Sequence, residues 1–549
     1  MTSLLPTHLL ALPVLLPLAT AAVLLAVGDR FRRFKAGASV LSMTASLGLA
    51  LYFLAWIDGR GQADAFAVYL PGNWPVPFGI VLVMDRLSAL MLLLSASASL
   101  AALLYSLARW ERASVYFHPL LQLQLMGLNG AFLTADLFNL FVFFEVLLAA
   151  SYGLLLHGGG VSRVRPGLHY IAINLVASLL FLIGVALIYG VTGTLNMADL
   201  AQKIPLVQPS DRGLLHAAAA LLAVAFLAKA ALWPLNFWLP TAYAAASAPS
   251  AAVFAVLTKV GIYAILRLWT LCFPSDAGES AHFGSPVLVW GGFATLAFGA
   301  VGMLASRQLG RLAGYSVIAT SGTLLAATGF DQPALTAAAL VYLASSTLAA
   351  CALFLLTELV ERPRQIEVDP PSADDRIERL PTFGERAPQE AVNLDDEQAV
   401  LVGRAMPAAL ASVAFAFFVC MLIVSGLPPL SGFVGKVAML AALLAQQGVA
   451  AWVLFVLLIV SGLLAAVALS RAFIAHFWTP QGRPPPQVRV AEMAPVALLL
   501  AGCIVLSVQG EQALRYTAAV ADQLHAPRHY IAAIMGAQTV PAPGKGAAR

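Results

Sequence analysis

The chain has 549 residues, of which 60% are hydrophobic and only 11% are charged. A soluble protein of this length cannot bury so much apolar surface. Apolar runs of about 20 residues recur from end to end, which predicts a polytopic, all-α membrane protein. The four cysteines stand singly in apolar segments without a CxxC pair, so neither a disulfide framework nor a metal cluster is expected.

Length and apolarity predict about fourteen membrane-spanning helices. In chain order they cover residues 5–28, 37–57, 80–107, 115–134, 136–157, 166–190, 213–239, 248–271, 286–305, 312–329, 333–360, 405–443, 448–477 and 491–509. Basic residues follow the first apolar run instead of preceding it, which indicates a retained helix rather than a cleaved signal peptide. Residues 192–200 are expected to form a short amphipathic helix at the membrane surface.

One soluble insertion interrupts the apolar pattern, at residues 361–403. Its acidic, proline-containing composition predicts a solvated connector and not a folded domain. The predicted organisation is N-terminal helices in 1–114, a first repeat in 115–272, a second repeat in 273–360 and 404–480, the connector in 361–403, and a last helix with a tail in 481–549.

The loops differ sharply in their basic residues. Loops after odd-numbered predicted helices hold most of the lysine and arginine, whereas loops after even-numbered helices hold only Arg60, Lys203 and Arg212. Basic loops stay on the cytoplasmic side of a membrane. We therefore expect both termini to lie outside.

A small group of ionisable residues lies inside the apolar runs, far from helix ends: Glu145, Lys229, Lys259 and Lys436. Glu145 follows Asp136 by nine residues, or about 13 Å of helix, which places it near the centre of an apolar layer about 30 Å thick. Each unpaired charge there costs at least about 2.5–3.5 kcal/mol. A static pair with Glu145 would account for one lysine but not for the other two. The pattern therefore favours a proton path over static packing.

Two of the predicted helices contain breaks close to these lysines. Pro234 follows Lys229 by five residues, and Pro428 and Pro429 precede Lys436. Proline removes a backbone hydrogen bond and kinks or breaks a helix. Interrupted helices at the seventh and twelfth positions predict two five-helix repeats, helices four to eight and nine to thirteen, with opposite orientation in the membrane.

Weaker candidates lie nearer the helix ends. Asp136 is equally well interpreted as a helix N-cap or as a proton entrance, and His216 is a candidate for the outer side of the path. Four other charged residues are expected at the membrane interface: Arg86, Arg267, Glu358 and Arg404. No P-loop, dinucleotide fingerprint, haem ligand pair or zinc signature appears, so no cofactor or metal is expected.

Six segments together resemble the proton-translocating antiporter-like family, which includes membrane-arm subunits of respiratory complex I and subunits of the Mrp-type (Pha-type) cation/proton antiporters. These segments are residues 136–145, 192–196, 229–240, 248–250, 258–267 and 426–433. The resemblance extends over about residues 80–480. Residues 192–200 and the acidic insertion favour the D-type subunits of the Mrp-type antiporters over the complex I relatives.

The resemblance implies roles for the buried charges. Glu145 and Lys229 would form a charge pair that modulates proton affinity, Lys259 would link two half-channels, and Lys436 would lie on the exit side. Many relatives carry a histidine in the eleventh helix, where this chain has Ser345 and Ser346. Hydroxyl groups and water would therefore connect Lys259 to Lys436.

The resemblance and the buried charges favour a proton-translocating subunit of a multi-subunit Na⁺ or K⁺/proton antiporter, a transporter rather than an enzyme. It is expected in the bacterial inner membrane, with both termini on the periplasmic side. Its expected partners are the other antiporter subunits, membrane lipid, protons and the cation, with no nucleic acid. Two alternatives stay open at this point: a proton-pumping subunit of a complex I-type NADH:quinone oxidoreductase, and a static scaffold.

Overall fold

The computed structural model describes residues 7–110, 116–157, 161–368, 408–478 and 488–539. Within these ranges the fold is helical apart from a short antiparallel hairpin of β1 (Ala67–Tyr69) and β2 (Leu82–Met84). The described part of the predicted connector, residues 361–368, continues a helix. The rest of the connector lies outside the described residues.

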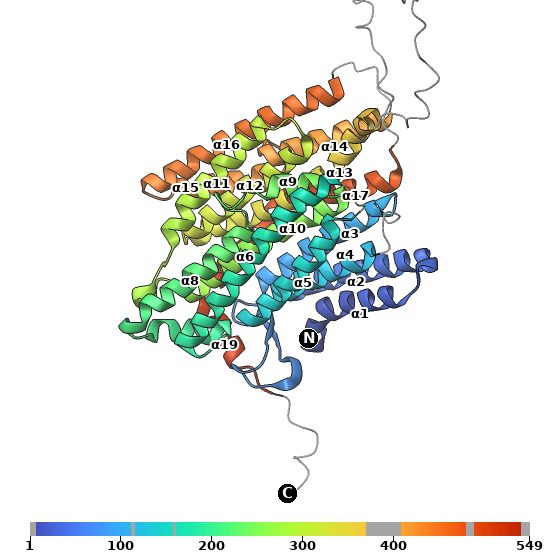
Figure 1. The fold of residues 1–549 in the computed structure, drawn as a ribbon. Coiled ribbons are helices and arrows are strands. Elements are labelled where there is room, and N and C mark those ends of the chain that lie inside the picture. The colour runs from blue at the N-terminus through green and yellow to red at the C-terminus, as the bar shows by residue number, and fades with distance from the viewer. Residues whose placement is uncertain (1–6, 111–115, 158–160, 369–407, 479–487, 540–549) are drawn as a thin grey trace, which may run out of the picture.

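The described helices follow one another in a single bundle (Figure 1). They are α1 (Leu12–Ala26), α2 (Arg32–Asp58), α3 (Arg86–Ser106), α4 (Phe117–Leu133), α5 (Leu137–Leu155), α6 (Val161–Thr192), α7 (Met197–Lys203), α8 (Pro209–Lys229), α9 (Leu239–Ala245), α10 (Ala248–Cys272), α11 (Ser285–Ala305), α12 (Leu309–Gly329), α13 (Pro333–Val368), α14 (Ala408–Ser425), α15 (Ser431–Leu444), α16 (Val449–Phe473), α17 (Val490–Val508), α18 (Gly510–Leu524) and α19 (Pro527–Met535). Short 3-10 or π turns are η1 (Thr7–Ala11), η2 (Asp29–Phe31), η3 (Pro71–Asn73), η5 (Ile204–Leu206), η6 (Gly278–Ser280) and η9 (Ile474–Trp478).

Twelve helical segments in the described ranges are long and apolar enough to cross a membrane. The prediction of an all-helical polytopic membrane protein is therefore confirmed. The two remaining predicted spans correspond to α4, with 17 residues, and to α12, with 21 residues.

The centre of the bundle is formed by α10 and α13. Every residue of α10 is buried, and this helix packs against α3, α8, α12 and α13. In Figure 1, α10 lies near the middle of the bundle, with α1 and α2 at one end and α16 at the opposite end. A side chain on α10 is thus far from lipid in every direction.

Two predicted boundaries are wrong for reasons of local hydrogen bonding. The helix predicted at 80–107 begins only at Arg86, because Leu82–Met84 pairs with Ala67–Tyr69 and Asp85 then caps α3 through the Ser88 amide at 2.8 Å. The helix expected on the membrane surface at 192–200 begins only at Met197, after the N-cap Asn196. It is also buried, because residues 197–201 are covered by α10 and α19.

The C-terminal tail contains two helices that the sequence analysis did not predict. The amphipathic α18 packs against α13, and α19 packs against α7 and β1. Both helices are too short and too polar to be predicted as membrane-spanning helices. They cover one end of the central helices.

Two predicted spans each correspond to two helices. Residues 213–239 contain α8, which ends at Lys229, and a connection that leads to α9 at Leu239. Residues 405–443 contain α14, which ends at Ser425, and α15, which begins at Ser431. Lys229 is therefore the last residue of its helix, whereas Lys436 lies one turn inside the second helix.

Candidate functional site

Glu145, Ser178 and Lys229 meet where α5, α6 and α8 come together. The Ser178 hydroxyl donates a hydrogen bond to Glu145 Oε1. Lys229 Nζ donates in turn to Ser178 Oγ at 3.4 Å. No direct ion pair joins Glu145 and Lys229 among the contacts of the described residues, so a serine hydroxyl connects the two charged groups.

The Lys229 ammonium group lies against a buried cluster of aromatic rings. Its Nζ lies 4.9 Å from the centre of the Phe144 ring. Phe144 stacks on Phe226, and Phe226 meets Phe181 edge to face. Lys229 itself is only 5% exposed. A cation over the face of a desolvated ring gains about 2 kcal/mol, which offsets part of the cost of burying this charge.

Lys259 has a very different environment on α10. It is 1% exposed, and its Nζ has no hydrogen-bond partner among the described residues. The Cys351 thiol of α13 donates its own hydrogen bond to the Ala252 carbonyl of α10 at 3.1 Å. A buried polar group without a partner is costly. The charge of Lys259 must therefore be satisfied by water or removed by deprotonation.

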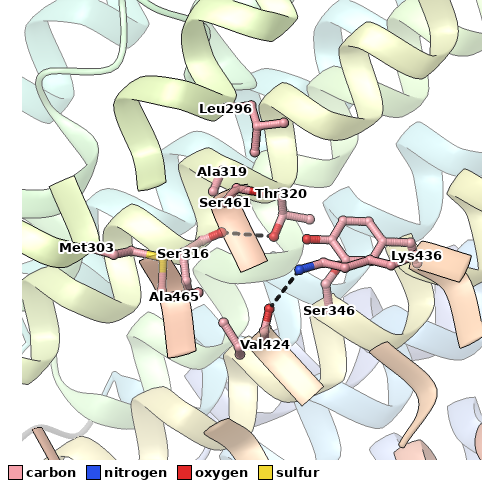
Figure 2. A pocket seen from close by; sticks show the side chains of 11 residues that line it. Leu296, Met303, Ser316, Ala319, Thr320, Ser346, Val424, Lys436, Ser461 and Ala465 are labelled. Carbon is pink, nitrogen blue, oxygen red and sulfur yellow. Dashed lines mark hydrogen bonds between the residues drawn. The ribbon is translucent and has the colours of Figure 1, made fainter. Parts of the chain in front are cut away.

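Lys436 is held by backbone carbonyls. Its Nζ donates to the Ser425 carbonyl at 2.8 Å and to the Val424 carbonyl at 3.5 Å; Figure 2 shows the second bond. These oxygens belong to the last turn of α14, which has no intrahelical donors for them. Gly426 makes the approach possible, because a Cβ there would lie 2.4 Å from Lys436 Cδ and its φ is +75°.

A small cavity lies beside Lys436. Its volume is about 20 Å³, enough for about one water molecule. Hydroxyl groups of Thr320, Ser346 and Ser461 line it together with Tyr342 (Figure 2). The two predicted serines thus separate: Ser346 lines the cavity, whereas Ser345 is hydrogen-bonded to Ser431 at 2.7 Å.

Two accessory candidates lie apart from these lysines. Asp136 is the N-cap of α5, since its Oδ1 accepts the Asn139 amide at 2.8 Å, and burial raises the pKa of its carboxyl. His216 contacts Ser280 Oγ at 3.0 Å and stacks on Phe283. It lies thirteen residues from Lys229 on α8, or about 20 Å along the helix, so the fold does not bring His216 to the charged group.

The predicted helix-breaking prolines lie in the connections from α8 to α9 and from α14 to α15. Pro234 is exposed in residues 230–238, and Pro428 and Pro429 are exposed in residues 426–430. Large apolar side chains accompany them, with Trp233 46% exposed and Leu427 40% exposed. Part of each connection is therefore left uncovered by this chain.

A buried ion pair was missed by the sequence analysis. Arg267, expected at the interface, lies with its side chain 7% exposed, and its Nη1 is 2.6 Å from the carboxylate of Asp85. Arg267 overcomes the effect of burial and lowers the pKa of the Asp85 carboxyl. Asp85 directly before an apolar helix was a visible N-cap signal, but nothing in the sequence connects it to α10.

The other three residues expected at the interface have different outcomes. Arg86 is 4% exposed, so it too is buried. Glu358 accepts hydrogen bonds from Trp110 Nε1 at 2.7 Å and from Arg362 at 3.0 Å. Arg404 lies outside the described residues. The described residues contain no group of three metal-ligating side chains.

Known proteins resemble this chain over nearly its whole length. Residues 134–464 match the family described as "NADH:quinone oxidoreductase/Mrp antiporter, TM". The D-type subunit of a probable K⁺/H⁺ antiporter from Rhizobium meliloti is 52% identical over 529 residues, which cover 95% of this chain and 96% of that protein. The D-type subunit of an Na⁺/H⁺ antiporter from Alkalihalophilus pseudofirmus is 33% identical, covering 96% of this chain and 99% of that protein.

A solved structure agrees with the sequence relatives. A chain of the Mrp complex from Dietzia sp. DQ12-45-1b superimposes with a TM-score of 0.80 at 28% identity, over 96% of this chain and all of that one. The family match covers the helices that carry Glu145, Lys229, Lys259 and Lys436. The chain therefore belongs to the NADH:quinone oxidoreductase/Mrp antiporter transmembrane family.

Proposed function

We propose that this chain is the proton-translocating D-type subunit of a multi-subunit monovalent cation/proton antiporter. The hydrogen-bonded group of Glu145, Ser178 and Lys229 is the observation that carries the proposal. Relatives named as antiporter subunits support it over a complex I-type pump. Their names differ in the cation, K⁺ in one and Na⁺ in the other, so the proposed substrate class is Na⁺ or K⁺ in exchange for protons.

The first proton-transfer step uses the bridging serine. A hydroxyl group both donates and accepts hydrogen bonds, and Ser178 does both here, toward Glu145 and from Lys229. Protonation of Glu145 removes the negative charge near Lys229, so the lysine loses part of the attraction that holds its proton. The proton of Lys229 is then released toward Lys259.

The later steps follow the other lysines. Lys259 receives the proton at the centre of the bundle. Its Nζ has no hydrogen-bond partner among the described residues, so water binds the charged form, or the lysine gives up its proton. The hydroxyl groups around the small cavity, with one water, pass the proton to Lys436. Asp136, whose carboxyl pKa is raised by burial, is the proposed entrance.

We also propose that the bundle contains two inverted five-helix units. The first comprises α4, α5, α6, α8 with α9, and α10; the second comprises α11, α12, α13, α14 with α15, and α16. Helix α6 packs against the interrupted helix α8 as α13 packs against α14 and α15. The segment boundaries are those given by the sequence: 115–272 for the first unit, and 273–360 with 404–480 for the second.

The uneven distribution of lysine and arginine among the loops supports one orientation of the chain in the membrane. The hairpin, α7 and α19 follow even-numbered predicted helices, and they lie in contact with one another at one face. We assign this face to the outside of a bacterial inner membrane, with both termini there. The opposite face, which carries most of the loop arginine, is then cytoplasmic.

Other antiporter subunits are the proposed partners. Irregular backbone inside a membrane is tolerated only where protein or a water-filled cavity covers it. The connections from α8 to α9 and from α14 to α15 are partly exposed on this chain, with Trp233 46% and Phe237 58% exposed in the first. Transmembrane helices of neighbouring subunits would cover these connections, and lipid would cover the remaining apolar faces.

The test is antiport by the complex that contains Glu145→Ala. Vesicles carrying the complex are energised, and dissipation of the pH gradient is measured when Na⁺ or K⁺ is added. We expect loss of cation-dependent proton movement at matched expression. Glu511→Ala is the control, because the side chain of this glutamate on α18 is 89% exposed. Full antiport in the Glu145 variant would overturn the mechanism and support a static scaffold.

The identity of the assembly has a separate test. The native complex is purified from its membrane and its subunits are identified by mass spectrometry. The result distinguishes an antiporter from a redox-driven pump. Further antiporter subunits are expected. Iron–sulfur and flavin subunits in the same complex would instead establish a redox-driven pump.

A further inference from the structure

Three titratable residues meet on the face assigned to the outside, each from a different part of the chain. Asp331 lies between α12 and α13, His282 lies before α11, and His525 is the C-cap residue of α18. His282 Nδ1 is 3.1 Å from Asp331 Oδ2, and His525 Nδ1 is 3.2 Å from Asp331 Oδ1. The other nitrogen of His525 is 3.2 Å from the hydroxyl of Thr336 on α13. One carboxylate therefore joins the tail to two loops.

His525 lies at the junction of α18 and α19, which cover the ends of α3 and α10. The Tyr516 hydroxyl donates to the Arg86 carbonyl at 2.8 Å. Gln523 accepts the Arg86 amide at 3.3 Å and donates to the Ala65 carbonyl at 3.1 Å. On α19, the ring of Tyr530 lies 5.1 Å from the Arg267 guanidinium. The tail thus closes over the buried pair of Arg267 and Asp85.

The covered end of α10 leads back to the centre of the bundle. Lys259, Tyr263 and Arg267 are spaced four residues apart, so they follow one side of the helix over about 12 Å. All three are buried, at 1%, 4% and 6% exposure. Opening of the tail would expose the polar end of this row to water, two helical turns from Lys259.

We propose that Asp331, His282 and His525 form a pH-sensing latch, which holds α18 and α19 closed over α3 and α10 at low external pH and releases them as the pH rises. Closure restricts water at the end of α10 and slows antiport. The effect on rate rests on the proposed function, because it requires Lys259 to carry protons. The latch itself does not.

The direction of the pH dependence follows from the charges. The hydrogen bond from His525 is the main cause that lowers the pKa of Asp331 below 3.8. The carboxylate is therefore ionised near neutral pH, and its stabilising contribution is lost only as the pH falls below 3.8. Histidine changes its charge near neutrality. A protonated imidazole beside the carboxylate makes a charge-assisted bond about twice as strong as a neutral one, so acidification tightens the latch.

The other charged groups near the latch have partners of their own. Arg528 on α19 lies 3.8 Å from Asp276, and Arg212 on α8 lies 3.2 Å from Glu279. His216, on α8, contacts Ser280 in the same loop as Glu279. The ion pairs of Asp331, by contrast, are with the two latch histidines.

The test is hydrogen–deuterium exchange of the purified complex at about pH 6 and about pH 8.5, on either side of histidine titration. Exchange rates of α18 and α19 are corrected for the intrinsic effect of pH. For the wild type, we expect about threefold to tenfold more opening at the higher pH, since ion pairs in contact with water are weak. Asp331→Asn should open the tail at both pH values and remove the pH dependence.

Two milder variants keep the test valid if Asp331→Asn fails to assemble. His525→Gln and His282→Gln retain a hydrogen-bonding side chain without the charge, and each should reduce the pH dependence. His529→Gln is the matched control, because His529 is exposed on α19 and should leave the wild-type response unchanged. Equal opening of the wild-type tail at both pH values would overturn the latch.

Antiport measured across the same pH range tests whether closure of the tail slows transport. Asp331→Asn should keep its activity at low pH, where the wild type slows. An unchanged pH profile in a variant with an open tail would overturn the gating. Because tail opening is measured without transport, loss of the proposed function through the Glu145 test would leave the latch result intact.

Discussion

Lys229 and Lys436 are both buried beside an interruption between two helices, yet their ammonium groups are held in different ways. Lys229 ends α8 and reaches a carboxylate through the Ser178 hydroxyl. Lys436 lies inside α15 and reaches back to the last carbonyls of α14. One lysine therefore has a partner whose charge changes on protonation, and the other has partners whose partial charge is fixed.

This difference separates two tasks. A carboxylate partner allows the proton affinity of a lysine to be switched, because protonation of Glu145 removes a full charge. The carboxyl end of a helix carries about half a negative charge, which favours the charged lysine in a constant manner. We infer that the Lys229 group responds to proton arrival, whereas the Lys436 site provides a steady position from which a proton leaves.

The largest effect is expected for Lys229→Ala. The substitution removes the only ammonium group bound to Ser178 in the described contacts and so interrupts transfer toward Lys259. We expect antiport in vesicles to fall by about 100-fold or more, the usual contribution of a positioned proton-transfer group. Retained activity at matched expression would mean that Glu145 and Lys229 form a structural pair.

Lys436→Met should combine a loss of rate with a loss of stability. The methionine has a similar length but cannot donate to the Ser425 carbonyl, so this buried oxygen loses a partner at a cost of about 1–3 kcal/mol. We expect antiport to fall by at least about tenfold and the thermal midpoint of the purified complex to decrease. If stability is unchanged, the carbonyls of α14 are not held by this lysine.

Ser178→Ala should have a smaller effect than either lysine variant. It removes the hydroxyl but leaves both charged groups, which water can bridge instead. We expect about a tenfold decrease in antiport, the equivalent of about 1.4 kcal/mol of barrier. Ser178→Thr should restore most of the rate, because threonine retains the hydroxyl. A threonine variant as slow as the alanine variant would show that packing, not proton transfer, is affected.

The buried charges could be predicted because a lysine or glutamate inside an apolar run is visible in the sequence itself. Ser178 could not, since serine is common in membrane helices and its role depends on contacts between α5, α6 and α8. Likewise, a charge near a helix end looks the same whether it faces lipid headgroups or protein. Only the packing of α3 against α10 shows that Arg267 is paired with Asp85.

The tail illustrates a second limit. The amphipathic pattern of α18 indicates a helix, but the partner of its apolar face is a property of the assembled bundle. Contacts from Tyr516 and Gln523 to the start of α3 join residues more than 400 positions apart. Sequence periodicity does not show which residues so far apart come into contact. The packing of α18 and α19 on the bundle therefore could not be predicted.

The smallest effects on antiport are expected for Ser345 and Ser346, the two serines that stand where a histidine was expected. Ser346 lines the cavity beside Lys436, whereas Ser345 is hydrogen-bonded to Ser431. Ser346→Ala should lower antiport about twofold to threefold, since it removes one of several hydroxyl groups around a single water site. Ser345→Ala should leave the rate unchanged and destabilise the complex by about 1 kcal/mol, the value of one buried hydrogen bond. The reverse outcome, a slower Ser345 variant beside an unaffected Ser346 variant, would move the proton route away from the cavity and toward the start of α15.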